Sequence, residues 1–301
     1  MQIDTLSAQY AIPGQLQFDT GRGGFPVAVI QNAHATAMVS LYAGQVLSWH
    51  PLTQAHEVLF LSEKAYYQTG KAIKGGVPIC WPWFGPDPLG KGRPAHGCAR
   101  ISDWDVLQTA ALEDGATRLL LGLTPQAEAR ALCGGDMTAQ LEITVGSSLH
   151  LALTTHNHGA AAVDLSQALH TYFAVGDIAQ VVVHGLEDLT YVDKVAAGSQ
   201  RVQSGPLTVT AEVDRIYTGV DRALTLHDAA YGRSIRIEAT GSTSAVVWNP
   251  WHETAAAMAD LDATDYRRML CVETANAGPD TIRLAGGASH TLTASYSVTT
   301  P

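Results

Sequence analysis

Residues 139–145 read AQLEITV, residues 149–155 read LHLALTT, and the three residues Gly146-Ser147-Ser148 lie between them. Apolar and polar side chains alternate in both segments, which is typical of β-strands that bury one face. A short loop containing glycine commonly joins two neighbouring antiparallel strands. This stretch therefore predicts a β-hairpin, and it sets the pattern for the rest of the chain.

Short apolar or alternating runs recur along the chain, at residues 27–30, 37–42, 119–123, 207–209, 235–238, 245–248 and 290–298. Helical periodicity is scarce, and the best helix candidates are short, at residues 125–133 and 263–268. The chain does not alternate strands with long helices, which argues against a Rossmann or TIM-barrel domain. No repeat or linker divides it, so we expect one all-β domain over residues 1–301, a large β-sandwich with few short helices.

The charge balance limits the kinds of ligand that the chain can bind. Of 301 residues only 15% are charged, 46% are hydrophobic, and the formal net charge is -10. An acidic chain does not suit a nucleic-acid partner, because phosphate contacts need a basic surface. If the ligand is an anion, a few Lys or Arg residues must gather in a local pocket against the overall field.

The cysteines and the N-terminus indicate the compartment. Cys80, Cys98, Cys133 and Cys271 form no C-x-x-C pair and have irregular spacing, so we expect four reduced thiols, mostly buried. The first ten residues lack the pattern of a signal peptide, and no run reaches the roughly 18 apolar residues of a membrane span. We expect a cytoplasmic protein without a membrane partner.

The least regular stretch is KGGVPICWPWFGP at residues 74–86. Proline cannot join the middle of a β-sheet, and glycine allows close approach of backbones, so the segment predicts a rigid aromatic wall. Aromatic faces suit the C–H face of a sugar ring. The alternative interpretation is a packed loop that caps one end of the sandwich, because aromatic residues most often belong to a core.

Other segments carry polar groups that can do chemistry. PAHGCAR at residues 94–100 places a histidine and an arginine four residues apart. In residues 166–173, strand alternation would put His170 and Tyr172 on one face and Leu169 and Thr171 on the other. A lone histidine in such a run is more often a hydrogen-bonded core residue than a catalyst.

Glu273 follows the apolar run at residues 269–272 and would be costly if buried unpaired. It therefore either pairs with a cation or backbone donors, or lines a pocket. Together with Asp193 it could in principle cleave a glycoside. His156 and His158 could share a strand face and bind a metal, but no third ligand is evident. No dinucleotide-binding, Walker A or nucleophile-elbow motif is present.

Seven motifs occur in a fixed order: KGGVPICWPWFGP, PAHGCAR, HTYF, YVDK, DRIY, WNP and CVET, from residue 74 to residue 274. In this order they resemble the glucose-6-phosphate 1-epimerases, the hexose-6-phosphate mutarotases of the aldose 1-epimerase superfamily. The resemblance implies a galactose mutarotase-like β-supersandwich, which agrees with the strand-rich pattern. It implies a small-molecule sugar phosphate as the partner and neither a cofactor nor a metal.

The resemblance also implies roles for individual residues. His170 in HTYF and Glu273 in CVET match the catalytic pair, and His96 matches a second histidine of the sugar site. Arg100 matches a phosphate-binding arginine. Lys74 stands where family members usually have arginine, and lysine keeps the charge but loses the bidentate fork.

Asp193 in YVDK resembles a sugar-hydroxyl contact. Trp83 from the aromatic wall and Asn249 from the WNP motif complete the predicted sugar-binding residues. Two further departures from the family pattern, Cys98 for a frequent Phe and Thr274-Ala275 for Pro-Gly, do not touch the proposed chemistry.

The predicted reaction opens and recloses the sugar ring, with Glu273 as base and protonated His170 as acid. Three alternatives remain open. The first is an aldose 1-epimerase that acts on unphosphorylated sugar, which needs the same chemistry without the cationic end. The second is a non-catalytic carbohydrate-binding or regulatory protein on the same fold. The third is a glycoside hydrolase.

Overall fold

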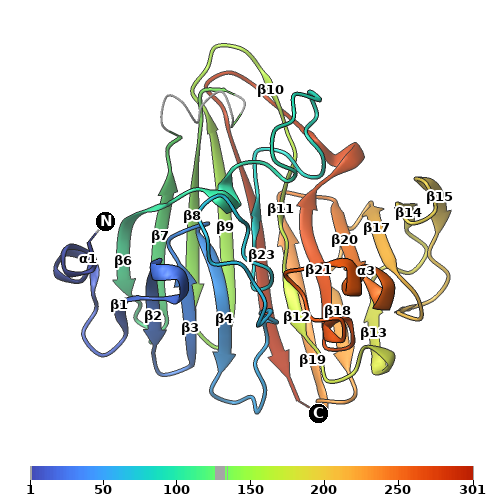
Figure 1. Ribbon diagram of the computed structural model, residues 1–301, viewed down its shortest axis with the longest axis horizontal. Coiled ribbons are helices and arrows are strands. Elements are labelled where there is room, and N and C mark those ends of the chain that lie inside the picture. Colours follow the sequence, from blue (N-terminus) through green and yellow to red (C-terminus); the bar gives the residue numbers. More distant parts are fainter. Residues whose placement is uncertain (1, 126–132, 134, 301) are drawn as a thin grey trace.

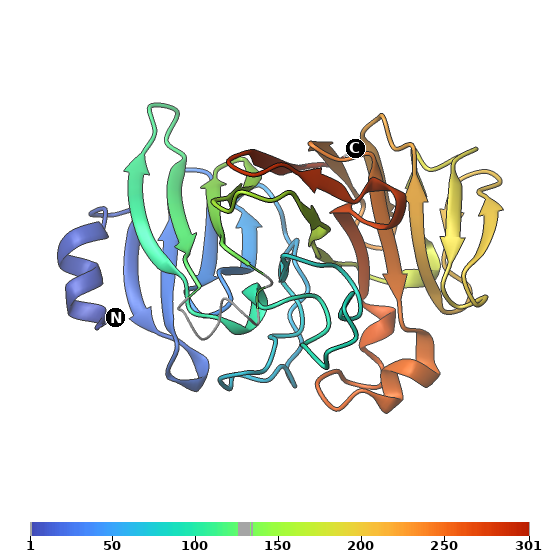
Figure 2. The same ribbon diagram turned by 90° about the horizontal axis from the view of Figure 1, so that it is seen from above.

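Two large antiparallel sheets form most of the molecule, and the computed structural model describes residues 2–125, 133 and 135–300 (Figure 1). Within these residues one sheet has nine strands and one has eight. A four-stranded sheet and a two-stranded sheet accompany them. The prediction of an all-β sandwich is confirmed. Blue strands lie at one end of the molecule and orange strands at the other, as both views show (Figures 1 and 2).

The strands have the following bounds and order. The four-stranded sheet is β1 (Leu16–Thr20), β2 (Pro26–Gln31), β3 (Ala35–Ser40) and β4 (Gln45–Pro51). The nine-stranded sheet is β16 (Leu207–Thr208), β13 (Val181–His184), β18 (Leu224–Asp228), β19 (Arg233–Thr240), β23 (Ser289–Thr299), β9 (Ser148–Asn157), β8 (Met137–Val145), β7 (Thr117–Leu123) and β6 (Asp105–Ala111). The eight-stranded sheet is β15 (Ser199–Val202), β14 (Thr190–Asp193), β17 (Val213–Thr218), β20 (Ser244–Asn249), β21 (Met269–Asn276), β11 (Gln167–Leu169) and β5 (Ile79–Cys80), with β12 (Tyr172–Ala174) paired to β21. The small sheet is β10 (Val163–Leu165) and β22 (Ile282–Leu284).

The predicted hairpin is β8 and β9, which pair antiparallel with Leu141 opposite Leu153 and Ile143 opposite Leu151. Burial alternates along both strands, as the sequence pattern requires. These four side chains are fully buried, and burying each contributes about 1.5–3 kcal/mol. Trp49 from β4 packs into the same core, so the four-stranded sheet covers this half of the nine-stranded sheet.

Helices are few and short within the described residues: α1 (Ile3–Tyr10) and α3 (Trp251–Ala257) are the α-helices, with single 3₁₀ turns elsewhere. Neither α-helix was among the candidates. The candidate at residues 263–268 contains the 3₁₀ turn Asp265–Arg267. The candidate at residues 125–133 falls almost wholly on residues outside those that the structure describes.

The strand β21 passes through the middle of the eight-stranded sheet, and all eight of its residues are buried. Leu270 and Val272 point into the main core between the large sheets, whereas Cys271 and Ala275 belong to smaller clusters on the outer face. Strand alternation places Glu273 between those two residues, on the outer face. Loops cover that face, so the carboxylate is buried beneath irregular segments and not inside the sandwich.

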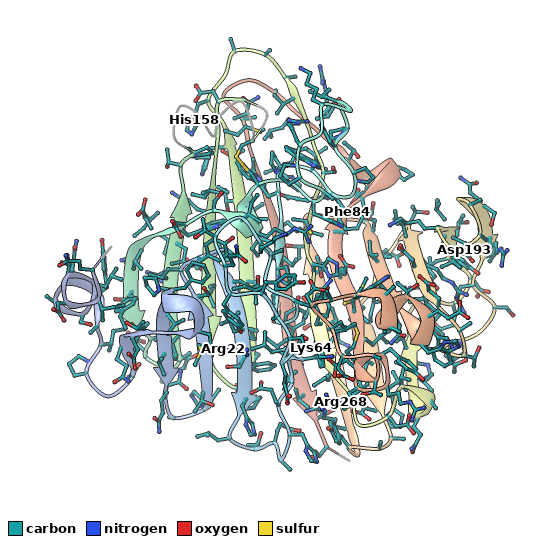
Figure 3. All side chains as sticks on the ribbon, viewed as in Figure 1. Arg22, Lys64, Phe84, His158, Asp193 and Arg268 are labelled. Atoms are coloured by element: carbon teal, nitrogen blue, oxygen red, sulfur yellow. A yellow bond between two sulfur atoms is a disulfide. The ribbon has the colours of Figure 1, made fainter. Side chains whose placement is uncertain are left out.

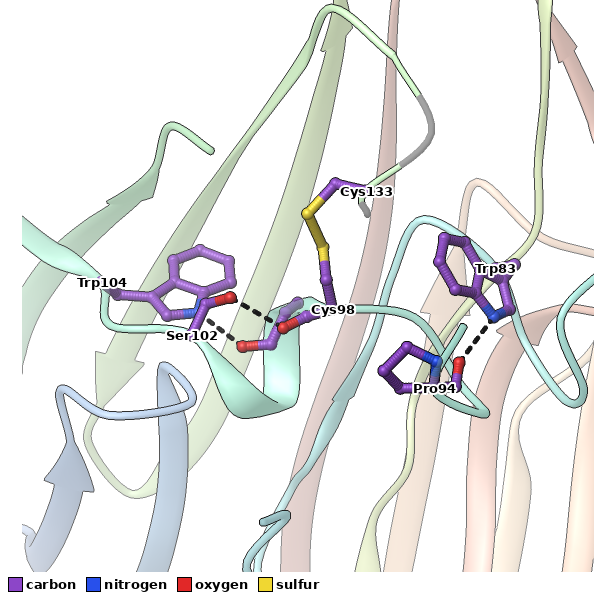
Figure 4. Close-up of a disulfide and its surroundings, with 7 residues drawn as sticks. Trp83, Pro94, Cys98, Ser102, Trp104 and Cys133 are labelled. Atoms are coloured by element: carbon purple, nitrogen blue, oxygen red, sulfur yellow. Dashed lines mark hydrogen bonds between the residues drawn. A yellow bond between two sulfur atoms is a disulfide. The ribbon is translucent and has the colours of Figure 1, made fainter. Parts of the chain in front are cut away.

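The expectation of four reduced cysteines is wrong for two of them. Cys98 and Cys133 form a disulfide with a Cα–Cα distance of 5.6 Å, whereas Cys80 and Cys271 are free and buried (Figure 4). Irregular spacing along the chain did not reveal this pair, because its 35-residue separation is closed by the fold. The bridge ties the motif at residues 94–100 to the connection between β7 and β8.

Candidate active site

Two glycines let the segment at residues 74–80 cross its neighbours closely. Gly75 and Gly76 have positive φ angles of 110° and 61°. A Cβ on Gly76 would collide with the carbonyl oxygen of Val46, and one on Gly75 would lie 2.5 Å from the carbonyl oxygen of Phe60. This close crossing places Lys74 beside the loops of the outer face. The segment then continues directly into β5.

The next motif is held against the first by backbone hydrogen bonds. The N–H of Cys98 donates to the carbonyl of Trp81 at 2.9 Å, and the N–H of Trp81 donates to the carbonyl of His96 at 3.3 Å. Gly97 lies so close to Trp81 that any Cβ there would overlap its carbonyl oxygen. His96 itself has a φ of 63°, a left-handed conformation that is costly for a non-glycine residue. The fold thus fixes the positions of His96 and Arg100.

A cavity of about 330 Å³ opens on the outer face of the eight-stranded sheet. Its walls come from segments far apart in the sequence, namely Lys74, Phe84, Ala95, His96, Arg100, His170, Tyr172, Lys194, Asp214, Val246, Trp248, Met258 and Glu273. Five of the eight predicted site residues are among them. The volume suits a ligand of monosaccharide size.

His170 and Glu273 meet on one wall of this cavity. Nδ1 of His170 lies 3.4 Å from Oε1 of Glu273, and the two side chains are 11% and 1% exposed. Within the described residues no hydrogen bond engages Nδ1 of His170 or Oε2 of Glu273. The His170 ring stacks on Tyr172 with centroids 4.9 Å apart and meets the edge of Trp248 at 6.2 Å. As predicted, Tyr172 shares the face of His170, while Thr171 points away and bonds Tyr296.

The surroundings of this pair favour its uncharged form. Burial lowers the pKa of His170 well below its ordinary value, and the nearby His96, Arg100 and Lys74 lower it further. Burial raises the pKa of Glu273 well above its ordinary value, and the Asp214 carboxylate adds to the rise. The single proton of the pair therefore rests on Glu273, whereas the predicted mechanism begins with that proton on His170. The two states differ by one proton transfer across the 3.4 Å contact.

His96 lies across the cavity, with its ring centroid 5.8 Å from that of His170. The edge of Phe84 contacts it at 4.9 Å. Burial lowers the pKa of His96 to about 3, and the cations Arg100, Lys194 and Lys74 act in the same direction. The ring is therefore neutral at pH 7.

Three cations surround the cavity. Lys74 lies 3.5 Å from Asp260, Lys194 lies 2.9 Å from Asp214, and Arg100 donates to the carbonyl of Ala95 at 2.8 Å. A side cavity of about 190 Å³ shares Lys74, Arg100 and Tyr172 with the main one. It adds a further cation, Lys71, to the wall. Lys74 and Arg100 thus stand where the two cavities meet.

Three predicted residues do not line the cavity. Trp83 donates its Nε1–H to the carbonyl of Pro94, and the Arg93 guanidinium lies over its ring at 4.0 Å. Asn249 is fully buried, and its amide bonds the backbone of Tyr266, Met269 and Trp251, so it holds the turn into α3. These two side chains hold the framework of the site and do not face it.

Asp193 is the third. It accepts from the N–H of Ala196 and lies 3.6 Å from Arg201, at the β14–β15 edge and away from Phe84 (Figure 3). Its neighbour Lys194 lines the cavity instead, because successive residues of an extended strand point to opposite faces. Asp214, which pairs with Lys194, was missed in the same way, although the DRIY motif contains it. Within the YVDK motif, Lys194 and not Asp193 lines the cavity.

A metal site is not evident in the described part of the chain, where no three His, Cys, Asp or Glu side chains group together. His156 and His158 do stack, with centroids 6.1 Å apart, but their rings bond Ser289 and Thr138. Among the same residues, neither α-helix has the length or the apolar character needed to cross a membrane.

Known proteins resemble this chain over most of its length. The sequence profile of the aldose 1-epimerase family matches residues 26–297. A protein of Salmonella typhimurium, named provisionally as a glucose-6-phosphate 1-epimerase, is 35% identical over 247 residues, which are 82% of this chain and 81% of the relative. An Escherichia coli protein of the same name is 35% identical over 250 residues, 83% of this chain and 82% of the relative.

The solved structures agree with the sequence matches. The crystal structure of a protein from Salmonella typhimurium, described provisionally as a mutarotase, superposes with a TM-score of 0.90 at 29% identity and covers 99% of both chains. An Escherichia coli structure provisionally described as an aldose 1-epimerase has a TM-score of 0.69 at 15% identity, over 91% of this chain and 99% of that one, and shares the fold. The chain therefore belongs to the aldose 1-epimerase family.

Proposed function

We propose that this protein interconverts the α and β anomers of a hexose 6-phosphate, with glucose 6-phosphate as the first substrate to test. The observation that carries the proposal is the contact of His170 with Glu273 at 3.4 Å on the wall of a sugar-sized cavity that also has a cationic end. The names of the Salmonella and Escherichia coli relatives point to the same reaction.

Anomer exchange requires one proton to leave the C1 hydroxyl and one to reach the ring oxygen O5 as the C1–O5 bond breaks. The open aldehyde then turns about the C1–C2 bond, and O5 attacks the other face of C1 as the two protons return. No electrons are gained or lost. His170 and Glu273 share one proton and can therefore accept one proton and deliver another in the same step. Each such proton transfer by a general acid or base typically raises the rate by about 10²–10⁴-fold.

The direction of the proton transfers follows from the form that reacts. In the charged form of the pair, the Glu273 carboxylate takes the C1 hydroxyl proton and the His170 imidazolium protonates O5. The neutral form is favoured in the structure, because burial acts on both groups. A sugar hydroxyl that donates to Glu273 stabilises its carboxylate, which makes the charged form accessible once substrate is bound.

The phosphate would lie at the junction of the two cavities. Lys74 and Arg100 border both spaces, and Lys71 adds a third cation to the side cavity. The binding energy of a remote phosphate can hold C1 of the ring against His170 and Glu273. Lys74 supplies a point charge where a bidentate arginine would supply a fork, so this end depends more on Arg100.

Asp214 and Lys194 offer recognition of hydroxyl groups on another wall. Their ion pair at 2.9 Å is partly exposed to the cavity, with side chains 22% and 40% exposed. A carboxylate accepts and an ammonium donates, so together they can bind adjacent sugar hydroxyls. Trp248 on the same cavity wall supplies an apolar face for the ring.

The rival substrate is unphosphorylated sugar, and one observation favours it. Asp260 lies 3.5 Å from Lys74 and offsets part of the charge that a phosphate would need. Exchange spectroscopy by NMR separates the two, with glucose and the 6-phosphates of glucose, galactose and mannose measured side by side. We expect the phosphorylated sugars to exchange with a much higher kcat/KM than free glucose.

Each other outcome has a definite meaning. Equal or faster exchange of free glucose assigns the protein to unphosphorylated aldoses. Normal binding of glucose 6-phosphate with exchange at the uncatalysed rate makes it a non-catalytic binding protein. Release of reducing sugar from a glycoside would instead identify a hydrolase.

A further inference from the structure

The two ring nitrogens of His96 have different surroundings. Nδ1 faces the protein, where the backbone N of Gly85 lies 3.3 Å away and Sγ of Cys80 also lies 3.3 Å away. Nε2 has no hydrogen-bond partner among the described residues, and His96 lines the cavity. The ring is therefore held from one side and free to bind a ligand on the other.

Both groups at Nδ1 are hydrogen-bond donors. A backbone N–H can only donate, so the Nδ1 atom that Gly85 faces must offer its lone pair. Burial raises the pKa of Cys80 far above its ordinary value, so the thiol keeps its proton and has an S–H to donate. A neutral imidazole carries a single N–H, which these two donors leave only at Nε2.

Cys80 is well placed to act on the ring. It lies in β5, which pairs with β11 through Ala168 opposite Cys80, two residues before His170. The side chain is fully buried and cannot turn toward water. The backbone of His96 is equally fixed by its left-handed conformation and by the close contact of Gly97 with Trp81.

We propose that Cys80 is a positioning residue which, with the backbone N–H of Gly85, fixes His96 in its Nε2–H tautomer. His96 then presents one hydrogen-bond donor to the cavity and no acceptor. Such a donor suits an oxygen that gains negative charge, as O5 does when the ring opens. The proton transfers themselves are left to His170 and Glu273. The identity of the acceptor rests on the proposed function, whereas the tautomer itself does not.

The tautomer can be measured without any sugar. Two-bond ¹⁵N–¹H correlation spectra of the ¹⁵N-histidine-labelled chain distinguish a protonated from an unprotonated ring nitrogen, with His96 assigned from the His96→Gln spectrum. We expect wild-type His96 to be protonated at Nε2. In Cys80→Ala one donor is lost, so the Nδ1–H form becomes detectable. Cys80→Ser keeps a hydroxyl donor on the same Cβ and retains the Nε2–H form.

Kinetics provide the second measurement, on sugar phosphate. In Cys80→Ala, part of the His96 population no longer donates from Nε2, so a hydrogen bond that strengthens in the transition state is weakened. We expect kcat to fall about three- to tenfold and KM to stay within about twofold of the wild-type value. Cys80→Ser recovers most of kcat. The matched control is Cys271→Ala, since Cys271 is also a fully buried free thiol, whereas the hydrogen bonds at Nδ1 of His96 involve Cys80 and Gly85.

Three results would overturn the inference. One is an Nδ1-protonated His96 in the wild-type chain. Another is a Cys80→Ala spectrum and kcat that both equal those of the wild type. The third is an equal loss of kcat in Cys80→Ala, Cys80→Ser and Cys271→Ala with the tautomer unchanged, which would mean that the thiol only fills space. If the tautomer behaves as expected but no sugar phosphate exchanges, the proposed function fails and the positioning role of Cys80 stands.

Discussion

Glu273 in β21 and His170 in the connection between β11 and β12 lie 3.4 Å apart, and burial moves their pKa values in opposite directions. Both shifts favour the neutral forms of the two groups, so the pair holds one proton, on Glu273, in a cavity whose other walls carry three cations. A pair in this state costs less to bury than an ion pair, which would need further hydrogen bonds to compensate its desolvation. Four predictions follow from the pair and from the elements that hold it.

Glu273→Gln is expected to abolish catalysis and preserve the fold. Glutamine has the shape of a protonated glutamate, and burial raises the pKa of Glu273 and so favours that protonated form, which means that little packing changes. Because the amide can neither take nor deliver the proton, anomer exchange should fall by at least about 10²-fold. NMR exchange rates measure the loss, and thermal unfolding at pH 6 checks the fold. A variant with near wild-type exchange would exclude Glu273 as an acid–base group.

The same substitution should change how stability depends on pH. The folded pKa of Glu273 is raised above its unfolded value, so the folded chain keeps a proton that the unfolded chain releases. The stabilisation is complete below the unfolded pKa and is lost as the pH rises toward the folded pKa, with a slope of up to about 1.4 kcal/mol per pH unit.

Relative to wild type, Glu273→Gln should therefore gain stability steadily as the pH is raised from 5 to 8. Urea unfolding at several pH values measures this difference. His170 is present in both proteins, so its own titration largely cancels in the comparison. A difference that stays constant over this range would mean that the folded pKa of Glu273 is ordinary.

Arg100→Ala should weaken binding of phosphorylated sugar far more than of free sugar. Hydrogen bonds to charged groups contribute about 1.5–3 kcal/mol each, so KM for glucose 6-phosphate should rise at least about tenfold. Lys74→Arg should lower that KM, because it adds a bidentate donor at the same place. Lys64→Ala is the matched control, since Lys64 forms an exposed ion pair with Asp262 outside the cavity lining. Equal effects of Arg100→Ala on both sugars would remove Arg100 from the phosphate site.

Local sequence patterns predicted many of the strands, β8 and β9 among them, but not β6, β13 or β18. They also predicted that His170 and Tyr172 share one face of the HTYF motif. Period-two alternation also explains why Glu273 points away from the main core. The same rule fails in the YVDK motif, because it says that Asp193 and Lys194 face opposite ways but not which of them faces the cavity. That choice depends on how β14 pairs with β17, a long-range contact that no local pattern contains.

Residue type misled in two further places. Asn249 and Trp83 are polar or aromatic members of motifs that build the site, yet both use their hydrogen-bonding groups on nearby backbone. The neighbouring Trp248 and Phe84 face the cavity instead. A motif can therefore be essential to a site while only alternate members of it touch the ligand, and the rest hold the irregular backbone in place.

The Cys98–Cys133 disulfide should stabilise both the fold and the position of the segment at residues 94–100, which carries His96 and Arg100. Cys98 lies between His96 and Arg100, and its carbonyl accepts from Ser102 at 2.8 Å while Trp104 bonds Ala99 at 3.1 Å (Figure 4). A bridge across a 35-residue separation restricts the unfolded chain by roughly 4 kcal/mol in the chain-entropy estimate. Cys98→Ser with Cys133→Ser should lower the unfolding free energy by a comparable amount.

The double variant should also show a raised KM for sugar phosphate, because Arg100 loses its fixed support, while kcat changes less since His170 and Glu273 lie in other segments. Urea unfolding and NMR exchange rates measure the two effects, and wild-type protein treated with dithiothreitol should match the variant. Cys271→Ala, treated with the same reductant, controls for effects of the reductant apart from the bridge, because it keeps the Cys98–Cys133 disulfide and Cys80 intact. If reduction and the double substitution leave both stability and KM unchanged, the bridge supports neither the fold nor the loop.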